Sequence, residues 1–138
     1  MVSLSVLADE LKAKTEYQET PRQITSEEYT AAIVYGLKRL YIDTGRASAW
    51  SDDLIDNGSF TGDLLIDEIE YVLIMAQMRF YEIVRASVNE MVSYTTNALS
   101  VTQGDKPYQN ITGTLKELDN ERRIVYYKMV RFALGENG

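Results

Sequence analysis

The chain has 138 residues, of which 45% are hydrophobic and 25% charged, with 8 Gly and 2 Pro. This composition is typical of one globular domain and excludes a disordered tail or a collagen-like repeat. The chain contains no His and no Cys, which removes imidazole and thiolate chemistry, and its net charge of -7 disfavours a general coating of nucleic acid.

An amphipathic helix is predicted over residues 3 to about 15, because Leu and Ala recur at helical spacing and Ser3 can cap the first turn. The spacing is then lost over residues 17–23, where Thr20-Pro21 disfavours helix. We interpret this stretch as a connector on which the first helix is free to swing.

Thr25 and Glu28 have the spacing of a capping box, in which each side chain satisfies the backbone amide of the other residue. This pattern predicts a helix over about 26–44, and Gly45 fits a left-handed stop. A shorter helical segment is predicted at 51–57, where Asn57-Gly58 ends it.

A long helix is predicted from about residue 62 past residue 90, as the centre of the fold. Its main apolar face comprises Ile66, Ile69, Val72, Leu73, Ala76, Phe80, Ile83, Val84 and Met91. A second apolar strip lies on another side of the same helix: Tyr71, Met75, Met78, Tyr81 and Val88. A helix covered on one face does not need this strip, so we expect that either the bundle surrounds it or another subunit does.

Residues 94–112 read as a loop or a loose β-hairpin, and Thr114 and Glu117 form a second capping box. A last helix is therefore predicted from Thr114 to Leu134. We expect an all-α fold, a small helical bundle of a single domain over 1–138. It divides into an N-terminal helix and connector (1–24), a bundle (25–134) and a tail (135–138).

The negative charge is concentrated in residues 43–70, where eight acids face a single base, Arg46. Acids favour helix N-termini and keep loops soluble, which accounts for most such windows. A sharper interpretation is an acidic surface that binds a basic partner or lines a passage for DNA. Asp63, Asp67 and Glu70 share one helical face, but no second set of ligands completes a metal site or a hydrolase centre.

Motif searches favour neither an enzyme nor a membrane protein. The chain contains no phosphate-binding glycine loop, no dinucleotide fingerprint and no nucleophile elbow, so we expect no catalytic activity and no cofactor. The longest apolar run, Tyr71 to Ala76, is far shorter than the roughly 20 residues of a bilayer span. We also expect no secretion signal at the N-terminus.

The tract from Asn97 to Tyr108, which follows a long helix, leads into a last helix that contains Leu118-Asp119-Asn120-Glu121-Arg122-Arg123. In these two segments the chain resembles the head-tail connector (adaptor or head completion) proteins of tailed bacteriophages. The similarity follows the order of elements over residues 25–134. It implies a structural virion protein without catalytic activity, assembled in the host cytoplasm.

The resemblance also implies partners and contact surfaces. The subunits would form a homo-oligomeric ring of about a dozen copies under the portal protein, extend the DNA channel without sequence-specific binding, and dock the next connector or tail component. The implied subunit interface is Tyr71, Met75, Met78 and Tyr81, and the implied portal contact is Tyr127, Met129, Phe132 and Leu134. A neighbouring subunit or ring would meet Gln103, Asp105, Lys106 and Tyr108, and the acidic candidates for the channel are Asp52, Asp53, Asp56 and Asp63.

The alternative interpretation is an acidic helical regulatory module that binds a basic protein, for instance as a nucleic-acid mimic, through residues 43–70. Binding that weakens steeply with salt would be its mark.

Overall fold

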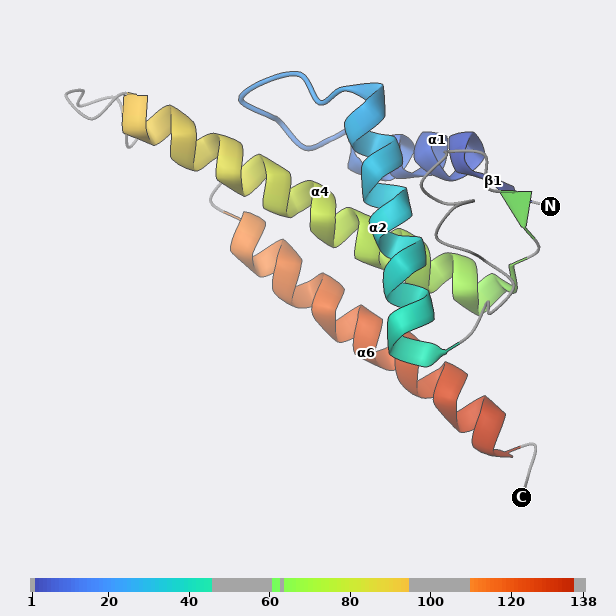
Figure 1. Cartoon of the computed structure of the whole chain (residues 1–138). Helices are drawn as coiled ribbons and strands as arrows, with labels where there is room; N and C mark the ends of the chain where they lie inside the picture. Colours follow the sequence, from blue (N-terminus) through green and yellow to red (C-terminus); the bar gives the residue numbers. More distant parts are fainter. Residues whose placement is uncertain (1, 46–60, 63, 95–109, 136–138) are drawn as a thin grey trace.

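The computed structural model describes residues 2–45, 61–62, 64–94 and 110–135 (Figure 1). These residues form four helices, α1 (Leu4–Thr15), α2 (Ser26–Thr44), α4 (Ile66–Tyr94) and α6 (Ile111–Gly135). The 29-residue α4 is the longest, α6 runs back alongside it, and α2 crosses it (Figure 1). The all-α bundle with a long central helix is confirmed.

The N-terminal helices begin where the sequence predicts. The Ser3 hydroxyl accepts a hydrogen bond from the Val6 amide at 3.3 Å and caps α1. Both halves of the capping box at Thr25 and Glu28 are formed at the start of α2. Gly45 ends α2 at φ 67°, in the left-handed region that glycine tolerates without a steric cost.

The other two helices begin at residues that differ from the prediction. Helix α4 starts at Ile66, four residues late, because the Glu68 carboxylate accepts from the Leu65 amide at 2.9 Å and so caps this turn. Helix α6 starts at Ile111, three residues before the predicted Thr114. The Thr114 amide already donates to the Asn110 carbonyl at 2.8 Å, so Thr114 lies inside the helix rather than at its cap.

A two-residue antiparallel pairing, β1 (Val2–Ser3) with β2 (Thr61–Gly62), was not predicted. Val2 lies opposite Gly62, which places the start of the chain beside the segment that precedes α4. The predicted segment at 51–57 and the predicted loop or hairpin, apart from residues 110–112, lie outside the described residues.

The core consists of two clusters that share α4. The larger one joins buried residues of all four helices, among them Leu7 and Leu11 of α1, and Leu37 of α2. The smaller one, farther along α4, packs Phe80, Val84 and Val88 against Ile24 and Ile111. Because α1 contributes to the larger cluster, it is fixed to the bundle rather than free to swing on the connector.

Helices α2 and α4 approach closely at Gly36. A Cβ atom at this position would lie 2.5 Å from the Val72 carbonyl oxygen, far inside van der Waals contact. Gly36 thus allows the two backbones to touch, which explains why Leu37 and Val72 are both inaccessible to solvent. The six apolar residues Tyr71–Ala76 are all buried, since the other helices surround α4 at this level.

Candidate functional site

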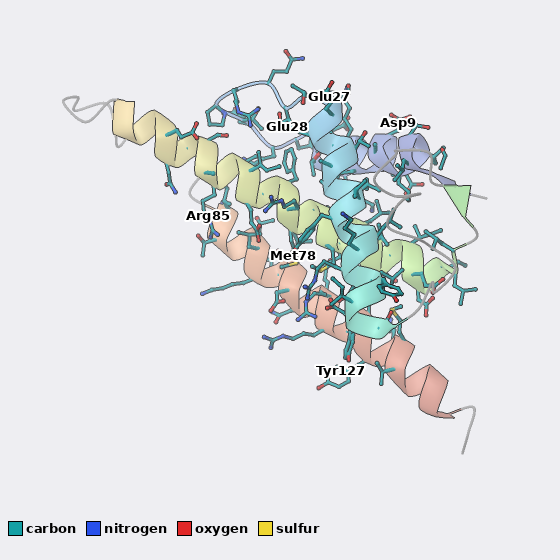
Figure 2. All side chains as sticks on the ribbon, viewed as in Figure 1. Asp9, Glu27, Glu28, Met78, Arg85 and Tyr127 are labelled. Atoms are coloured by element: carbon teal, nitrogen blue, oxygen red, sulfur yellow. The ribbon has the colours of Figure 1, made fainter. Side chains whose placement is uncertain are left out.

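An exposed apolar pair marks the outer side of α6. Ile124 is 56% exposed and Tyr127 is 69% exposed, and they lie one helical turn apart. Exposed Arg123 and Lys128 flank them, so this face combines apolar area with positive charge. In the view of Figure 2, Tyr127 is drawn beside the C-terminal end of α2.

Of the predicted portal contacts, Tyr127 is therefore accessible, but Met129 is not. The Met129 side chain is completely buried in the larger core cluster, on the opposite side of the helix. The prediction of Met129 as a contact is wrong. Residues two positions apart in a helix, such as Tyr127 and Met129, lie on nearly opposite sides, because each pair of steps turns the helix by about half a turn or more. The side chains of Phe132 and Leu134 lie outside the described part of the chain.

The predicted subunit interface is divided in the same way. Tyr71 and Met75 are buried in the core of their own chain, so these two side chains are not available to a second subunit and their assignment is corrected. Met78 and Tyr81 are half-buried at the edge of this cluster (Figure 2). The bundle itself covers most of the second apolar strip.

Two further sets of predicted residues lie outside the described residues. They are the neighbour or next-ring contacts Gln103, Asp105, Lys106 and Tyr108 and the acidic channel candidates Asp52, Asp53, Asp56 and Asp63. These assignments stay predictions.

A chain of polar side chains joins α2, α4 and α6. Arg39 donates to one Asp43 oxygen at 2.6 Å, and the Tyr71 hydroxyl donates a short hydrogen bond to the other. On α6, Arg122 donates through Nε to Asp119 at 2.9 Å, and its guanidinium acts electrostatically on Tyr71. The sequence analysis assigned none of these polar groups to a site, since Asp43, Tyr71 and Arg122 meet only in the folded chain.

The environment of Tyr71 keeps its hydroxyl protonated. Burial and the hydrogen bond to the Asp43 carboxylate raise its pKa to about 12, because both disfavour the phenolate. The Arg122 guanidinium acts in the opposite direction but does not prevail. Tyr71 therefore stays neutral and donates to Asp43.

A cavity of about 280 Å³ opens beside this polar chain. Arg39 and Asp43 of α2, Met75 of α4, and Arg122 and Tyr126 of α6 line it. The Nε atom of Arg39 is buried and has no hydrogen-bond partner among the residues that the structure describes. Buried polar groups are rarely left without partners, so this atom is an unusual feature of the arginine that lines the cavity.

A second hollow, of about 350 Å³, lies between α1, α4 and α6. Its floor is apolar, with Ile69, Leu73 and Ile74, and Glu10, Glu70 and Glu121 are among the charged residues at its rim. Ile66 also lines it and is 86% exposed, although the predicted main face of the long helix included it. The Ile66 side chain is therefore not covered by the rest of the described chain.

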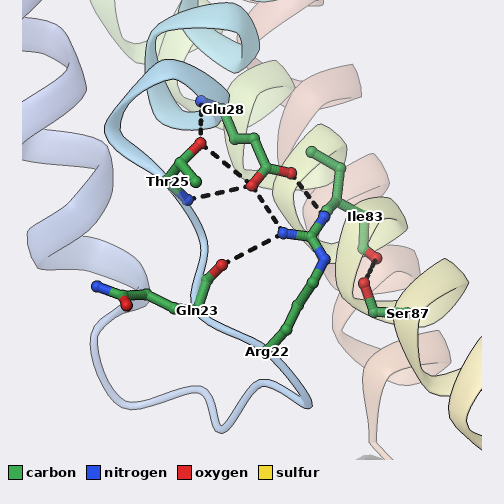
Figure 3. A network of polar contacts seen from close by, with 6 residues as sticks. All are labelled: Arg22, Gln23, Thr25, Glu28, Ile83 and Ser87. Carbon is green, nitrogen blue, oxygen red and sulfur yellow. Dashed lines mark hydrogen bonds and ion pairs between the residues drawn. The ribbon is translucent and has the colours of Figure 1, made fainter.

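An arginine-carboxylate pair fastens the connector to α2 (Figure 3). Arg22 donates through both terminal nitrogens to the two Glu28 oxygens, each at 2.7 Å, and also to the Gln23 carbonyl at 3.3 Å. Glu28 also forms the capping box with Thr25, since its carboxylate accepts from the Thr25 amide and its own amide donates to the Thr25 hydroxyl. The hydrogen bonds to Arg22 and Thr25 lower the Glu28 pKa to about 2, and the bond to Arg22 has the largest effect.

Within the described residues, no group of three or more acids lies close enough together to hold a metal ion. The helices, as far as they are described, include no stretch long and apolar enough to cross a bilayer. The chain matches no protein-family model, no curated protein and no solved structure.

Proposed function

We propose that the chain is a structural subunit of a tailed-phage connector, an adaptor that forms a ring under the portal. The ring would extend the DNA channel and dock the next connector or tail component, and the subunit would catalyse no reaction. The observation that carries the proposal is the outer face of α6, where the last helix presents Ile124 and Tyr127 to solvent. Exposed aromatic residues beside an arginine, here Tyr127 with Arg123, are typical of protein-protein contacts.

This proposal assigns the outer face of α6 to the portal. Of the predicted portal contacts, it retains Tyr127 and omits the buried Met129, and it adds the exposed Ile124. The half-buried Met78 and Tyr81 remain the candidates for the contact between subunits. The connector function is taken from the sequence resemblance, because a helical-bundle fold does not by itself determine a function.

The acidic regulatory module receives less support. Among the acids of residues 43–70 that are described, Asp43 is held by Arg39 and Tyr71, and Glu68 is buried and caps α4. Their charges serve the fold and are not free for a basic partner. Glu70, exposed on α4, is a described acid that this alternative retains.

The portal contact is tested by capture of purified chain on portal rings from the same virus. We expect Tyr127→Ser to weaken capture by about tenfold or more, as for an aromatic hot spot. The matched control is Tyr17→Ser, since Tyr17 is 90% exposed but lies in the connector.

Circular dichroism should show that both variants keep their helices. Equal capture of the two variants would contradict the assigned face, and no capture of the unmodified chain would contradict the adaptor role. The native mass of the chain, alone and on the portal, would test whether a closed ring forms.

A further inference from the structure

We propose that the cavity between α2, α4 and α6 is a binding site for an oxyanion, a carboxylate or a phosphate group. The cavity lies beside two guanidinium groups from different helices, Arg39 and Arg122, and the Tyr126 side chain completes its polar wall. This site is separate from the outer face of α6 and does not depend on the adaptor role.

The balance of donors and acceptors determines the charge of the ligand. A guanidinium carries five N–H donors and no acceptor. Both Asp43 oxygens are occupied, by Arg39 and Tyr71, and the two Asp119 oxygens accept from Arg122 and Arg123. The buried Nε of Arg39 stays without a partner in the described part of the chain. The cluster thus has more donors than acceptors, and this balance favours a ligand rich in acceptors.

Charge favours the same class of ligand. Arg39, Arg122 and Arg123 together carry one more charge than Asp43 and Asp119. Asp43 also lines the cavity, but its charge is compensated at short distance by Arg39, and the Tyr71 hydroxyl donates to it. Arginine forks bind carboxylate and phosphate with paired hydrogen bonds, which a water molecule cannot reproduce.

The volume limits the size of the ligand. About 280 Å³ is below the range of roughly 300–1,000 Å³ that is usual for drug-sized ligands. A single phosphate ion or the carboxylate of an acidic side chain fits this space better than a nucleotide. Since the cavity opens to solvent, the oxyanion can arrive either as a free ion or on an acidic residue of a docked protein.

The test is a titration of the whole chain with inorganic phosphate at constant ionic strength, followed by NMR of the arginine Nε–H groups. We expect the Arg39 and Arg122 signals to move and then saturate, while the signal of exposed Arg85 stays in place (Figure 2). A parallel titration with acetate separates the sources. Saturation by phosphate alone indicates a free phosphate-type ion, and saturation by acetate as well indicates a carboxylate.

Variants connect the signal to the cavity. We expect Arg122→Gln to weaken the saturating response of Arg39 by about tenfold or more, the loss expected for a charge-assisted contact. Arg79→Gln is the matched control, because Arg79 forms an exposed pair with Glu82 at 3.4 Å on α4. A linear drift shared by all arginines in the unmodified chain, or an equal response in both variants, would overturn the proposal.

Discussion

The Glu28 carboxylate performs two tasks with one side chain, since it caps α2 and binds Arg22 of the connector. Its pKa falls from 4.5 to about 2, so the pair stabilises the fold fully above the unfolded-state value and less as the pH falls from 4.5 towards 2. The pair is partly exposed, so we expect a loss of only about 1 kcal/mol in the free energy of unfolding over this range.

Glu28→Gln should remove this part of the pH dependence, while Glu27→Gln, on the exposed position beside it, should leave it in place. Urea unfolding of the three proteins at several acidic pH values measures the difference. Parallel pH profiles of the unmodified chain and Glu28→Gln would show that the pair contributes nothing.

Tyr71 gives the corresponding prediction at alkaline pH. Its pKa is raised from 10 to about 12, so its contribution is complete below pH 10 and is lost as the pH rises from 10 to 12. Tyr71→Phe should destabilise the chain at neutral pH by about 1–2 kcal/mol, because Asp43 loses a partner. The variant should then lose less stability than the unmodified chain above pH 10.

Phenolate absorbance and denaturant unfolding across this pH range check the prediction. Tyr17→Phe is the control, because Tyr17 lies exposed in the connector. If the unmodified chain and the Tyr71→Phe variant form the same amount of phenolate above pH 10, Tyr71 does not have the environment described above.

At the scale of elements, the crossing of α2 and α4 depends on Gly36. Gly36→Ala places a methyl group against the Val72 carbonyl, which cannot move without shifting the α4 backbone. We expect a loss of about 1–3 kcal/mol, as for overpacking in a core. Gly113→Ala in α6 is the matched control, since its Cβ would meet nothing within 4 Å, and it should be neutral or slightly stabilising.

Thermal unfolding of the two variants measures the contrast. A Gly36→Ala chain as stable as Gly113→Ala would mean that the helices separate without cost, contrary to the tight contact between them.

Helix limits could be predicted from the sequence where a local signal determines them. The cap at Thr25 and the stop at Gly45 act through neighbouring residues, and both predictions are confirmed. The start of α6 depends instead on the burial of Ile111 against α4, a distant contact that overrides the capping pattern at Thr114. For the same reason helical periodicity placed Ile66 in the core, since it does not show where neighbouring helices end.

The two sites also differ in whether neighbouring residues or distant contacts determine them. The exposed face of α6 was predicted only in part, because the resemblance implied Tyr127 together with the buried Met129 and did not include the exposed Ile124. The cavity was not predicted, because its walls come from three helices and Asp43 and Tyr71 are 28 residues apart. Sequence patterns describe one element at a time, whereas this cavity is a property of the packing between elements.

At the scale of the whole molecule, α4 supplies buried side chains to both clusters, and so does α6. Because one continuous helix supplies side chains to both, disorder in either cluster should propagate along α4, and the bundle should unfold in a single transition. Leu37→Ala probes the larger cluster and Val84→Ala the smaller one, and both side chains are completely buried.

We expect Leu37→Ala to lower the free energy of unfolding by about 2–5 kcal/mol, and Val84→Ala to lower it by less, because it removes fewer atoms. In both variants the midpoint of urea unfolding should fall while the slope stays unchanged. Far-ultraviolet circular dichroism and tyrosine fluorescence should give coincident curves, because helices and side-chain packing are lost together. A second transition in Val84→Ala alone would instead show that the end of α4 near Val88 and the start of α6 near Ile111 form an independent unit. In that case the second half of α6, around Tyr127, would stay folded on the larger cluster while its first turns open.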